Sequence, residues 1–137
     1  MSQANVESVR RSLDAWNRDD FETYVSGAHP EVEWTSEVAE RMAGSGTVYT
    51  GVEGLRRHWD EWREIWTVKV NVTDVIDLGD TAIAVAETVA RGHGVGLEME
   101  QPVAYVFEFE DGLTRRARSS FAVDQVLSSF GVDATGV

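Results

Sequence analysis

The sequence has no cysteine and no long apolar run. Without cysteine, disulfides, thiol catalysis and cysteine-based zinc sites are excluded. No apolar run approaches the ~18 residues that a membrane span requires, so we expect no membrane partner. Residues 1–7 have neither the basic region nor the apolar region of a signal peptide, and we therefore expect a cytoplasmic protein.

Basic residues are also scarce. The chain has 12 Lys and Arg against 24 Asp and Glu, which gives a formal net charge of −12. Phosphate binding requires clustered basic side chains, so this balance argues against a nucleic-acid partner. With 42% hydrophobic residues among 137, the chain is able to bury a core. We expect one domain over residues 1–132, followed by a disordered tail at 133–137.

The first half of the chain has the periodicity of helices. An apolar stripe over residues 5–18 predicts a first helix, and Asp19 is the expected cap of a short second helix that contains Tyr24. Thr50 and Glu53 have the spacing of a capping box before a third helix. The apolar stripe of this third helix is rich in tryptophan: Val52, Leu55, Trp59, Trp62 and Trp66.

The second half of the chain has the periodicity of strands. From Thr67 onward apolar residues alternate with polar ones. Gly79-Asp80 and Asp111-Gly112 are the expected turns of two hairpins, and residues 123–130 are typical of a short closing helix. Helices followed by antiparallel strands indicate an α+β domain.

Four short motifs support a family resemblance: residues 17–21 (NRDDF), 29–34 (HPEVEW), 49–56 (YTGVEGLR) and 77–80 (DLGD). In this order the chain resembles the nuclear-transport-factor-2-like superfamily, and within it the SnoaL-like (polyketide-cyclase-like) proteins. The resemblance implies a cystatin-like, cone-shaped domain, in which a curved antiparallel sheet wraps around N-terminal helices and encloses a pocket. It also implies a homodimer joined through the outer sheet face. Because the superfamily contains both enzymes and non-catalytic binders, the fold does not settle the function.

The catalytic residues of known relatives have no counterparts in this chain. The ketosteroid-isomerase type needs a tyrosine on the first helix, which has none, and its base position falls on Trp34, with Glu33 on the opposite face of the strand. The late-strand acids of the isomerase, epoxide-hydrolase and cyclase types fall within residues 101–107 and 113–121, where no acid occurs. Two hypotheses remain: a cofactor-independent isomerase, cyclase or hydrolase that uses other residues, or a non-catalytic ligand-binding protein.

Two other acids are the candidate catalytic pair. A two-residue loop at Gly79-Asp80 sets the register so that Val72 faces Glu87. In the same register Asp74 is a diagonal neighbour of Glu87 on the apolar face. Desolvation and mutual repulsion would raise the pKa of one carboxyl toward neutrality, as a proton-transfer base requires.

Two alternatives compete with this hypothesis. A bulge near Asp74 would turn its side chain outward, or Arg91 would neutralise Glu87. An alignment of the Gly79 turn with the epoxide-hydrolase pattern turns Ala86 and Thr88 inward instead. The sequence leaves open which face of this strand is buried.

A small, largely apolar organic molecule is the expected ligand, since the flat faces of tryptophans suit such a molecule. The candidate ligand-binding residues combine aromatic rings with a few polar groups: Trp34, Trp59, Trp62, Tyr24, His58 and Ser119. For Tyr105, cation–π packing against Arg118 on an outer face is the simpler expectation.

No cofactor or metal is expected. The three histidines lie on different predicted elements, which makes a metal site improbable. The glycine-rich runs at 44–46 and 92–96 do not connect a strand to a helix, as a dinucleotide-binding loop would.

Overall fold

The structure is a computed structural model that describes residues 3–37, 48–94 and 96–132. Expectations for the tail at 133–137 and for the glycine run at 44–46 fall outside the described residues. In chain order the elements are α1 (Gln3–Asn17), α2 (Phe21–Ser26), β1 (Ala28–Ser36), β2 (Val48–Thr50), α4 (Gly51–Ile65), β3 (Trp66–Asp77), β4 (Thr81–Gly92), β5 (Glu98–Glu110), β6 (Leu113–Ser120) and α5 (Val123–Ser129).

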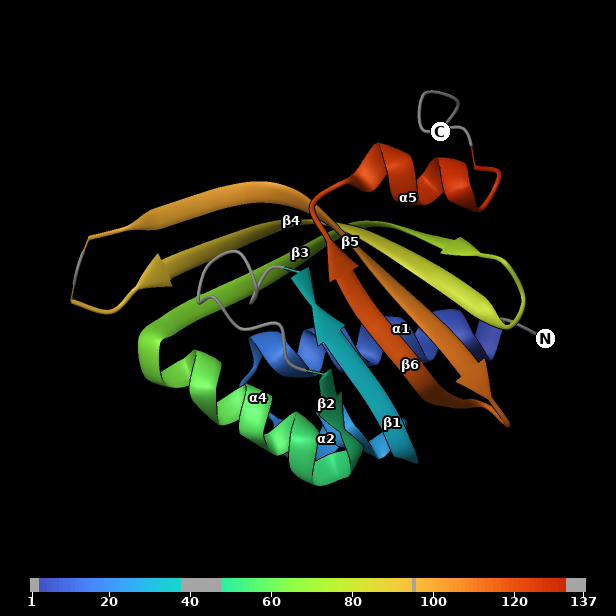
Figure 1. The fold of residues 1–137 in the computed structure, drawn as a ribbon, viewed down its shortest axis with the longest axis horizontal. Coiled ribbons are helices and arrows are strands. Elements are labelled where there is room, and N and C mark those ends of the chain that lie inside the picture. The colour runs from blue at the N-terminus through green and yellow to red at the C-terminus, as the bar shows by residue number, and fades with distance from the viewer. Residues whose placement is uncertain (1–2, 38–47, 95, 133–137) are drawn as a thin grey trace.

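Six strands form one curved sheet in the order β2-β1-β6-β5-β4-β3 (Figure 1). Neighbouring strands are antiparallel except β1 and β6, which run parallel. The predicted α+β class, with N-terminal helices against a curved sheet, is confirmed. The sheet is mixed rather than antiparallel because the chain leaves β1 through β2 and α4, builds β3 to β5, and then returns as β6 beside β1.

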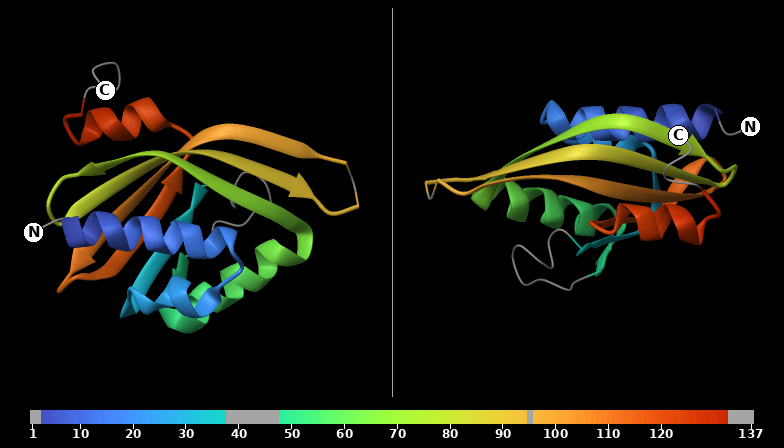
Figure 2. Two further views of the ribbon diagram at one scale, coloured as in Figure 1. Left: turned by 180° about the vertical axis from the view of Figure 1, so that it is seen from behind. Right: turned by 90° about the horizontal axis from the view of Figure 1, so that it is seen from above.

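The two faces of the sheet carry different layers. Helix α1 lies across one face and α5 lies against the opposite one (Figure 2, right). We call the face toward α1 the inner face and the face toward α5 the outer face. The larger inner core includes Leu13 and Trp16 of α1. A smaller outer core is formed by Ile83, Ala104, Val106, Val126 and Leu127. The expected dimer contact through the outer face stays a prediction.

Of the two predicted helix caps, Asp19 is wrong and Thr50 is confirmed in position but not in its side-chain hydrogen bond. Helix α2 is capped by Asp20 and not by Asp19, because the Thr23 N–H donates to the Asp20 carboxylate at 3.2 Å. Hydrogen bonding from the Thr23 side chain and from its backbone N–H lowers the pKa of Asp20. Asp19 instead has a φ of 61° and lies 2.9 Å from Arg63 Nε. Thr50 does precede the first residue of α4, but its side chain makes no capping hydrogen bond to a described residue.

The β3–β4 hairpin contains the two acids predicted as a catalytic pair. Near its turn the register is as expected, and Asp74 faces Val85. A bulge between Val72 and Asp74 then shifts the register, so that Glu87 faces Asn71 rather than Val72. The alternative with a bulge near Asp74 is therefore correct.

Both acids lie on the outer face. Val85, which faces Asp74, packs against the outer core. Glu87 is two residues further along β4 and shares this outward direction. The prediction that Asp74 and Glu87 lie on the buried apolar face is therefore wrong. The side chains of β4 that point inward are small and buried: Ala82, Ala84, Ala86, Thr88 and Ala90.

A second bulge, between Glu108 and Phe109, shifts β5 against β6. Tyr105 therefore faces Ser119 instead of Arg118, and it lies on the inner face with only 7% of its surface exposed. The expected cation–π packing of Tyr105 on an outer face is wrong. The turn at Asp111-Gly112 was predicted correctly, but the bulge that follows it has no comparable signal in the sequence.

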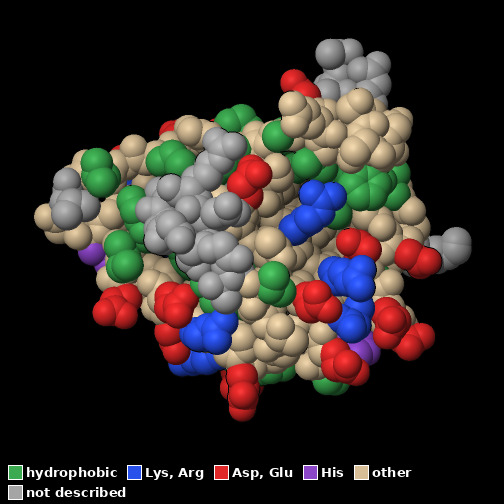
Figure 3. All heavy atoms as spheres, viewed as in Figure 1, with side chains coloured by type: hydrophobic (Ala, Val, Ile, Leu, Met, Phe, Trp, Pro, Cys, Tyr) green, Lys and Arg blue, Asp and Glu red, His purple; other side chains and the backbone are tan. Residues whose placement is uncertain are grey.

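The molecular surface reflects the acidic composition. Figure 3 shows acidic side chains spread over the view that contains β1 and β6, around a smaller number of basic ones. Such a surface repels anionic molecules at a distance. Within residues 3–37, 48–94 and 96–132, no helix is both long and apolar enough to cross a membrane.

Candidate functional site

A cavity of about 80 Å³ lies between the inner face of the sheet and helices α1, α2 and α4. This volume is small beside the roughly 300–1,000 Å³ of pockets that hold drug-sized ligands. The described lining residues include no Asp, Glu, Lys or Arg. They are Ser12, Leu13, Trp16, Tyr24, Gly27, Ala28, Val32, Trp34, Ser36, Leu55, His58, Trp62, Val68, Val70, Thr88, Tyr105, Phe107, Thr114, Ala117 and Ser119.

His58 of α4 lines the cavity within a group of aromatic rings. Its imidazole centroid is 4.9 Å from that of Tyr49, 5.5 Å from Trp34 and 6.1 Å from Trp62. Helix α4 approaches β2 closely because residue 54 is glycine: a Cβ at Gly54 would lie 2.9 Å from the Tyr49 carbonyl carbon. His58 is consequently only 5% exposed.

Neither nitrogen of His58 has a hydrogen-bond partner among the described residues. A buried polar atom without a partner costs about 1–3 kcal/mol. Burial also lowers the pKa of His58 from 6.5 to about 3, because the charged imidazolium would lose its hydration. At neutral pH the ring is therefore uncharged, with one N–H donor and one acceptor nitrogen.

Trp34 of β1 contains a third unpartnered polar atom on the same cavity wall. Its Nε1 is buried and has no hydrogen-bond partner in the described part of the chain. The indole packs edge-on against the His58 imidazole, with an interplanar angle of 73°. An indole N–H only donates hydrogen bonds. Two neighbouring side chains thus present polar atoms that a bound molecule or a water is able to satisfy.

Four hydroxyl-bearing side chains cross the inner face from β4 to β1, and all four line the cavity. The hydroxyls of Thr88 and Tyr105 are 2.8 Å apart, and Ser119 donates to Ser36 Oγ at 3.2 Å. Tyr105 faces Ser119 in the register, which connects the two pairs into one row. Burial raises the pKa of Tyr105 to about 12, so its hydroxyl stays protonated.

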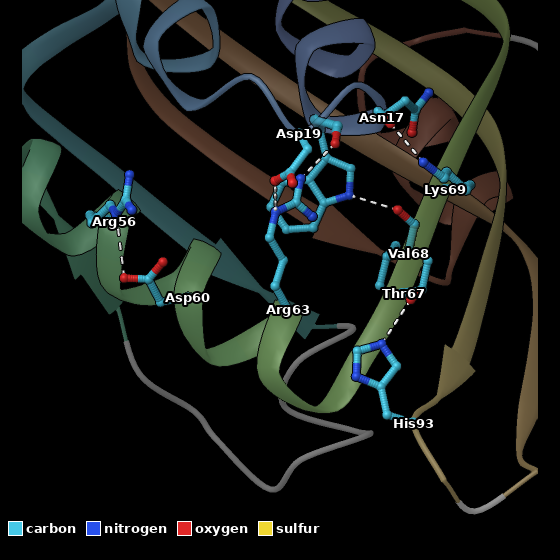
Figure 4. Close-up of polar contacts among 10 residues, drawn as sticks. Asn17, Asp19, Arg56, Asp60, Arg63, Thr67, Val68, Lys69 and His93 are labelled. Carbon is cyan, nitrogen blue, oxygen red and sulfur yellow. Dashed lines mark hydrogen bonds and ion pairs between the residues drawn. The ribbon is translucent and has the colours of Figure 1, made fainter.

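The C-terminal end of α1 is fastened to β3 and α4 (Figure 4). The Asn17 side chain donates to Val70 O at 2.7 Å and accepts from Val70 N at 2.8 Å, as a neighbouring strand would. Lys69 Nζ donates to Asn17 O at 2.6 Å, and Arg63 Nη2 donates to Trp16 O at 2.6 Å. These bonds fix Trp16, a lining residue, relative to the sheet.

Five of the six predicted ligand-binding residues line the cavity: Trp34, Trp62, Tyr24, His58 and Ser119. The sixth, Trp59, does not. Its ring packs edge-on against Phe21 and lies 3.8 Å from the guanidinium carbon of Arg63. Trp59 therefore supports the wall from behind, and a binding role for the other five stays a prediction.

The predicted catalytic acids Asp74 and Glu87 are absent from the described lining of the cavity. Glu87 follows Ile83 and Val85 to the outer face, and the β3 bulge places Asp74 on the same face, so the geometric basis for their proton-transfer role is lost. Within the same described residues, no group of three or more His, Asp or Glu is placed to hold a metal ion.

Two lining residues, Thr88 and Tyr105, were not among the predicted site residues. For Thr88 a signal existed: the alternative alignment of the Gly79 turn points Ala86 and Thr88 inward, and the structure places both on the inner face. For Tyr105 the decisive feature is the bulge between Glu108 and Phe109, which depends on tertiary packing.

Comparisons with known proteins agree with this architecture. A protein of unknown function with an NTF2-like fold from Burkholderia pseudomallei has a TM-score of 0.79 at 17% identity, over 91% of this chain and 95% of its own. TerC, crystallised with polyporic acid, has a TM-score of 0.78 at 19% identity, over 91% and 96%. A Catenulispora acidiphila protein with a ketosteroid isomerase-like fold, in complex with trimethylamine, has a TM-score of 0.74 at 16% identity, over 94% and 95%.

No curated protein matches the sequence. The family model described as a SnoaL-like domain matches residues 9–117, which extend from α1 into β6 and include most of the cavity lining. The chain therefore belongs to the SnoaL-like domain family.

Proposed function

We propose that the protein binds a small, largely apolar organic molecule in the inner cavity, without a cofactor. One observation carries this proposal: Trp34 Nε1 and both His58 nitrogens are buried without a described partner on the wall of an otherwise mainly apolar cavity. Unpaired buried polar atoms are unfavourable, and a bound molecule supplies the missing hydrogen bonds.

Two further facts support the proposal. The lining is dominated by aromatic and aliphatic side chains, as in most small-molecule sites. Two proteins of the same fold also hold small organic molecules in their crystals, polyporic acid in TerC and trimethylamine in the Catenulispora protein. These proteins share only the fold with this chain, so their ligands are not assigned to it.

Binding is tested by titrating ¹⁵N-labelled protein with acetophenone and following the indole N–H resonances of its five tryptophans. We expect the resonances of Trp16, Trp34 and Trp62 to shift in a saturable manner, because all three line the cavity. Ala117→Leu, which places a larger side chain on the cavity wall, should abolish the shifts. Unchanged binding by a folded Ala117→Leu protein would contradict the proposal.

The second candidate function is cofactor-independent proton transfer. His58 is the candidate base because it is the only histidine among the described lining residues. Its imidazole is uncharged at neutral pH, so one ring nitrogen is free to accept a proton. This function ranks second because the lowered pKa of His58 makes its imidazole a weak base at neutral pH, and because the described lining contains no carboxylate to stabilise the imidazolium that would form.

Deuterium exchange separates the two candidates. With 1-phenylpropan-2-one in D₂O, catalysis moves a benzylic proton to His58 and returns a deuteron from solvent to the same carbon. A rate above that of buffer, lost in His58→Phe, would establish the catalytic function. Saturable binding with exchange at the buffer rate would leave the non-catalytic binder.

A further inference from the structure

The hydrogen-bonding atoms on the cavity wall restrict the chemical class of the ligand more than the apolar part of the wall does. Trp34 Nε1–H only donates, and neutral His58 offers one donor and one acceptor. The Thr88–Tyr105 bond uses one of its two hydroxyl protons, which leaves a third donor. The hydroxyl oxygens also accept hydrogen bonds, but Trp34 Nε1–H has no described partner and only donates, so the complementary ligand presents an acceptor oxygen to it.

The charges around the cavity restrict the ligand further. The lining, as far as the structure describes it, contains no charged side chain. The neighbouring cation, Arg63, lies outside the described lining. Its charge is paired with Asp19 at 2.9 Å and its Nη2 donates to Trp16 O, although its Nε has no hydrogen-bond partner among the described residues. A carboxylate ligand would therefore be buried without a counter-charge, which is strongly unfavourable. An ammonium ligand cannot accept the hydrogen bond that Trp34 offers.

We propose that the ligand is an uncharged carbonyl compound whose oxygen accepts a hydrogen bond from Trp34 Nε1–H, with His58 as the second hydrogen-bonding partner. This inference rests on the proposed function and narrows it to a ligand class. The two rings come from β1 and α4, and their centroids are 5.5 Å apart, so both reach the same part of the cavity. The carbonyl group binds there, and the apolar remainder packs against rings such as Trp62 and Phe107.

Four probes of similar size and different polar groups test the inference: acetophenone, ethylbenzene, benzoate and benzylammonium. Dissociation constants are measured by NMR titration at neutral pH. We expect acetophenone to bind at least tenfold more tightly than each of the other three, with a downfield shift of the Trp34 indole proton. This shift is the signature of a hydrogen bond, which a purely steric fit would not produce.

A matched pair of variants locates the effect. Trp34→Phe keeps an aromatic ring and removes the N–H, so the preference for acetophenone over ethylbenzene should fall below threefold. Trp59→Phe makes the same chemical change at a buried tryptophan outside the described lining, and it should keep the preference. His58→Phe should also lower the acetophenone affinity, and heteronuclear spectra verify that each variant is folded.

The outcomes separate the inference from the proposed function. Equal binding of acetophenone and ethylbenzene would overturn the inference while the proposed function stands. Tightest binding of benzoate or benzylammonium would likewise overturn it, in favour of a charged ligand. Binding of none of the four probes would count against the inference and the proposed function together.

Discussion

The two sides of β4 are buried in different ways. The larger aliphatic side chains Ile83 and Val85 point to the outer face, where α5 buries Ile83 completely. The inner side carries alanines and Thr88, and the space above them is occupied by aromatic rings of α1, α4 and β1. On the inner face, rigid rings lie opposite small residues and a cavity remains between them. Under α5 the aliphatic side chains pack against one another, and none of them lines that cavity. The comparison indicates that the outer core is the more closely packed side, and that the inner face contains the free volume in which we propose that the ligand binds.

The largest expected effect is on the outer core. Ile83→Ala should lower the free energy of unfolding by about 2–5 kcal/mol, because Ile83 is 0% exposed and its loss leaves a cavity under α5. Chemical denaturation measures the loss, and Val85→Ala, at a half-buried position on the same face, should cost less. If Ile83→Ala cost no more than Val85→Ala, α5 would not form a packed core.

The second effect concerns pH and the inner face. The pKa of His58 is about 3 in the folded protein against 6.5 in the unfolded chain. Between these values the unfolded chain binds the extra proton, so the stability contributed by neutral His58 is present above about pH 6.5 and declines as the pH falls. From there to about pH 5 the free energy of unfolding should fall by about 2 kcal/mol from this group.

His58→Phe is the control for the pH effect. The variant keeps a buried ring and removes both unpartnered nitrogens. Its free energy of unfolding should therefore lack the pH dependence that the titration of His58 causes. At pH 7 it should be more stable than the original protein by about 1 kcal/mol. Identical pH profiles for the two proteins would show that His58 is hydrated or paired in solution.

The third prediction compares one substitution on the two faces. Ala104 is 0% exposed in the outer core, and Ala117 lines the cavity. Ala104→Leu overpacks a filled space, which typically costs about 1–3 kcal/mol. Ala117→Leu extends into free volume and should cost at least about 1 kcal/mol less, while it blocks acetophenone binding. Equal costs in thermal or chemical unfolding would contradict the difference in packing between the faces.

The smallest effect is expected at the acids of the outer face. Glu87→Gln and Asp74→Asn should each change stability by no more than about 0.5 kcal/mol, because both side chains lie on a partly exposed face outside the described cavity lining. The dissociation constant for acetophenone should stay unchanged. If either variant bound acetophenone tenfold more weakly, that acid would belong to the binding site, and its placement outside the site would be wrong.

The fold was predictable because its signals are local. The tryptophan stripe of α4, the period-two strands and the turns at Gly79 and Asp111 all depend on residues near one another in sequence. The catalytic pair was mispredicted because one bulge, between Val72 and Asp74, reverses the direction of every side chain beyond it. Alternation alone carries no information about where a strand interrupts its register.

The sequence by itself determined the α+β class, the order of helices and strands and the aromatic side of α4, since each follows from periodicity and turn chemistry within short segments. The tertiary structure alone decided which face of β4 is inward and which polar atoms are buried without partners. Those properties arise where distant segments meet: α4 packs against β1 and β2, and this packing buries the polar atoms of His58 and Trp34 without a partner among the described residues.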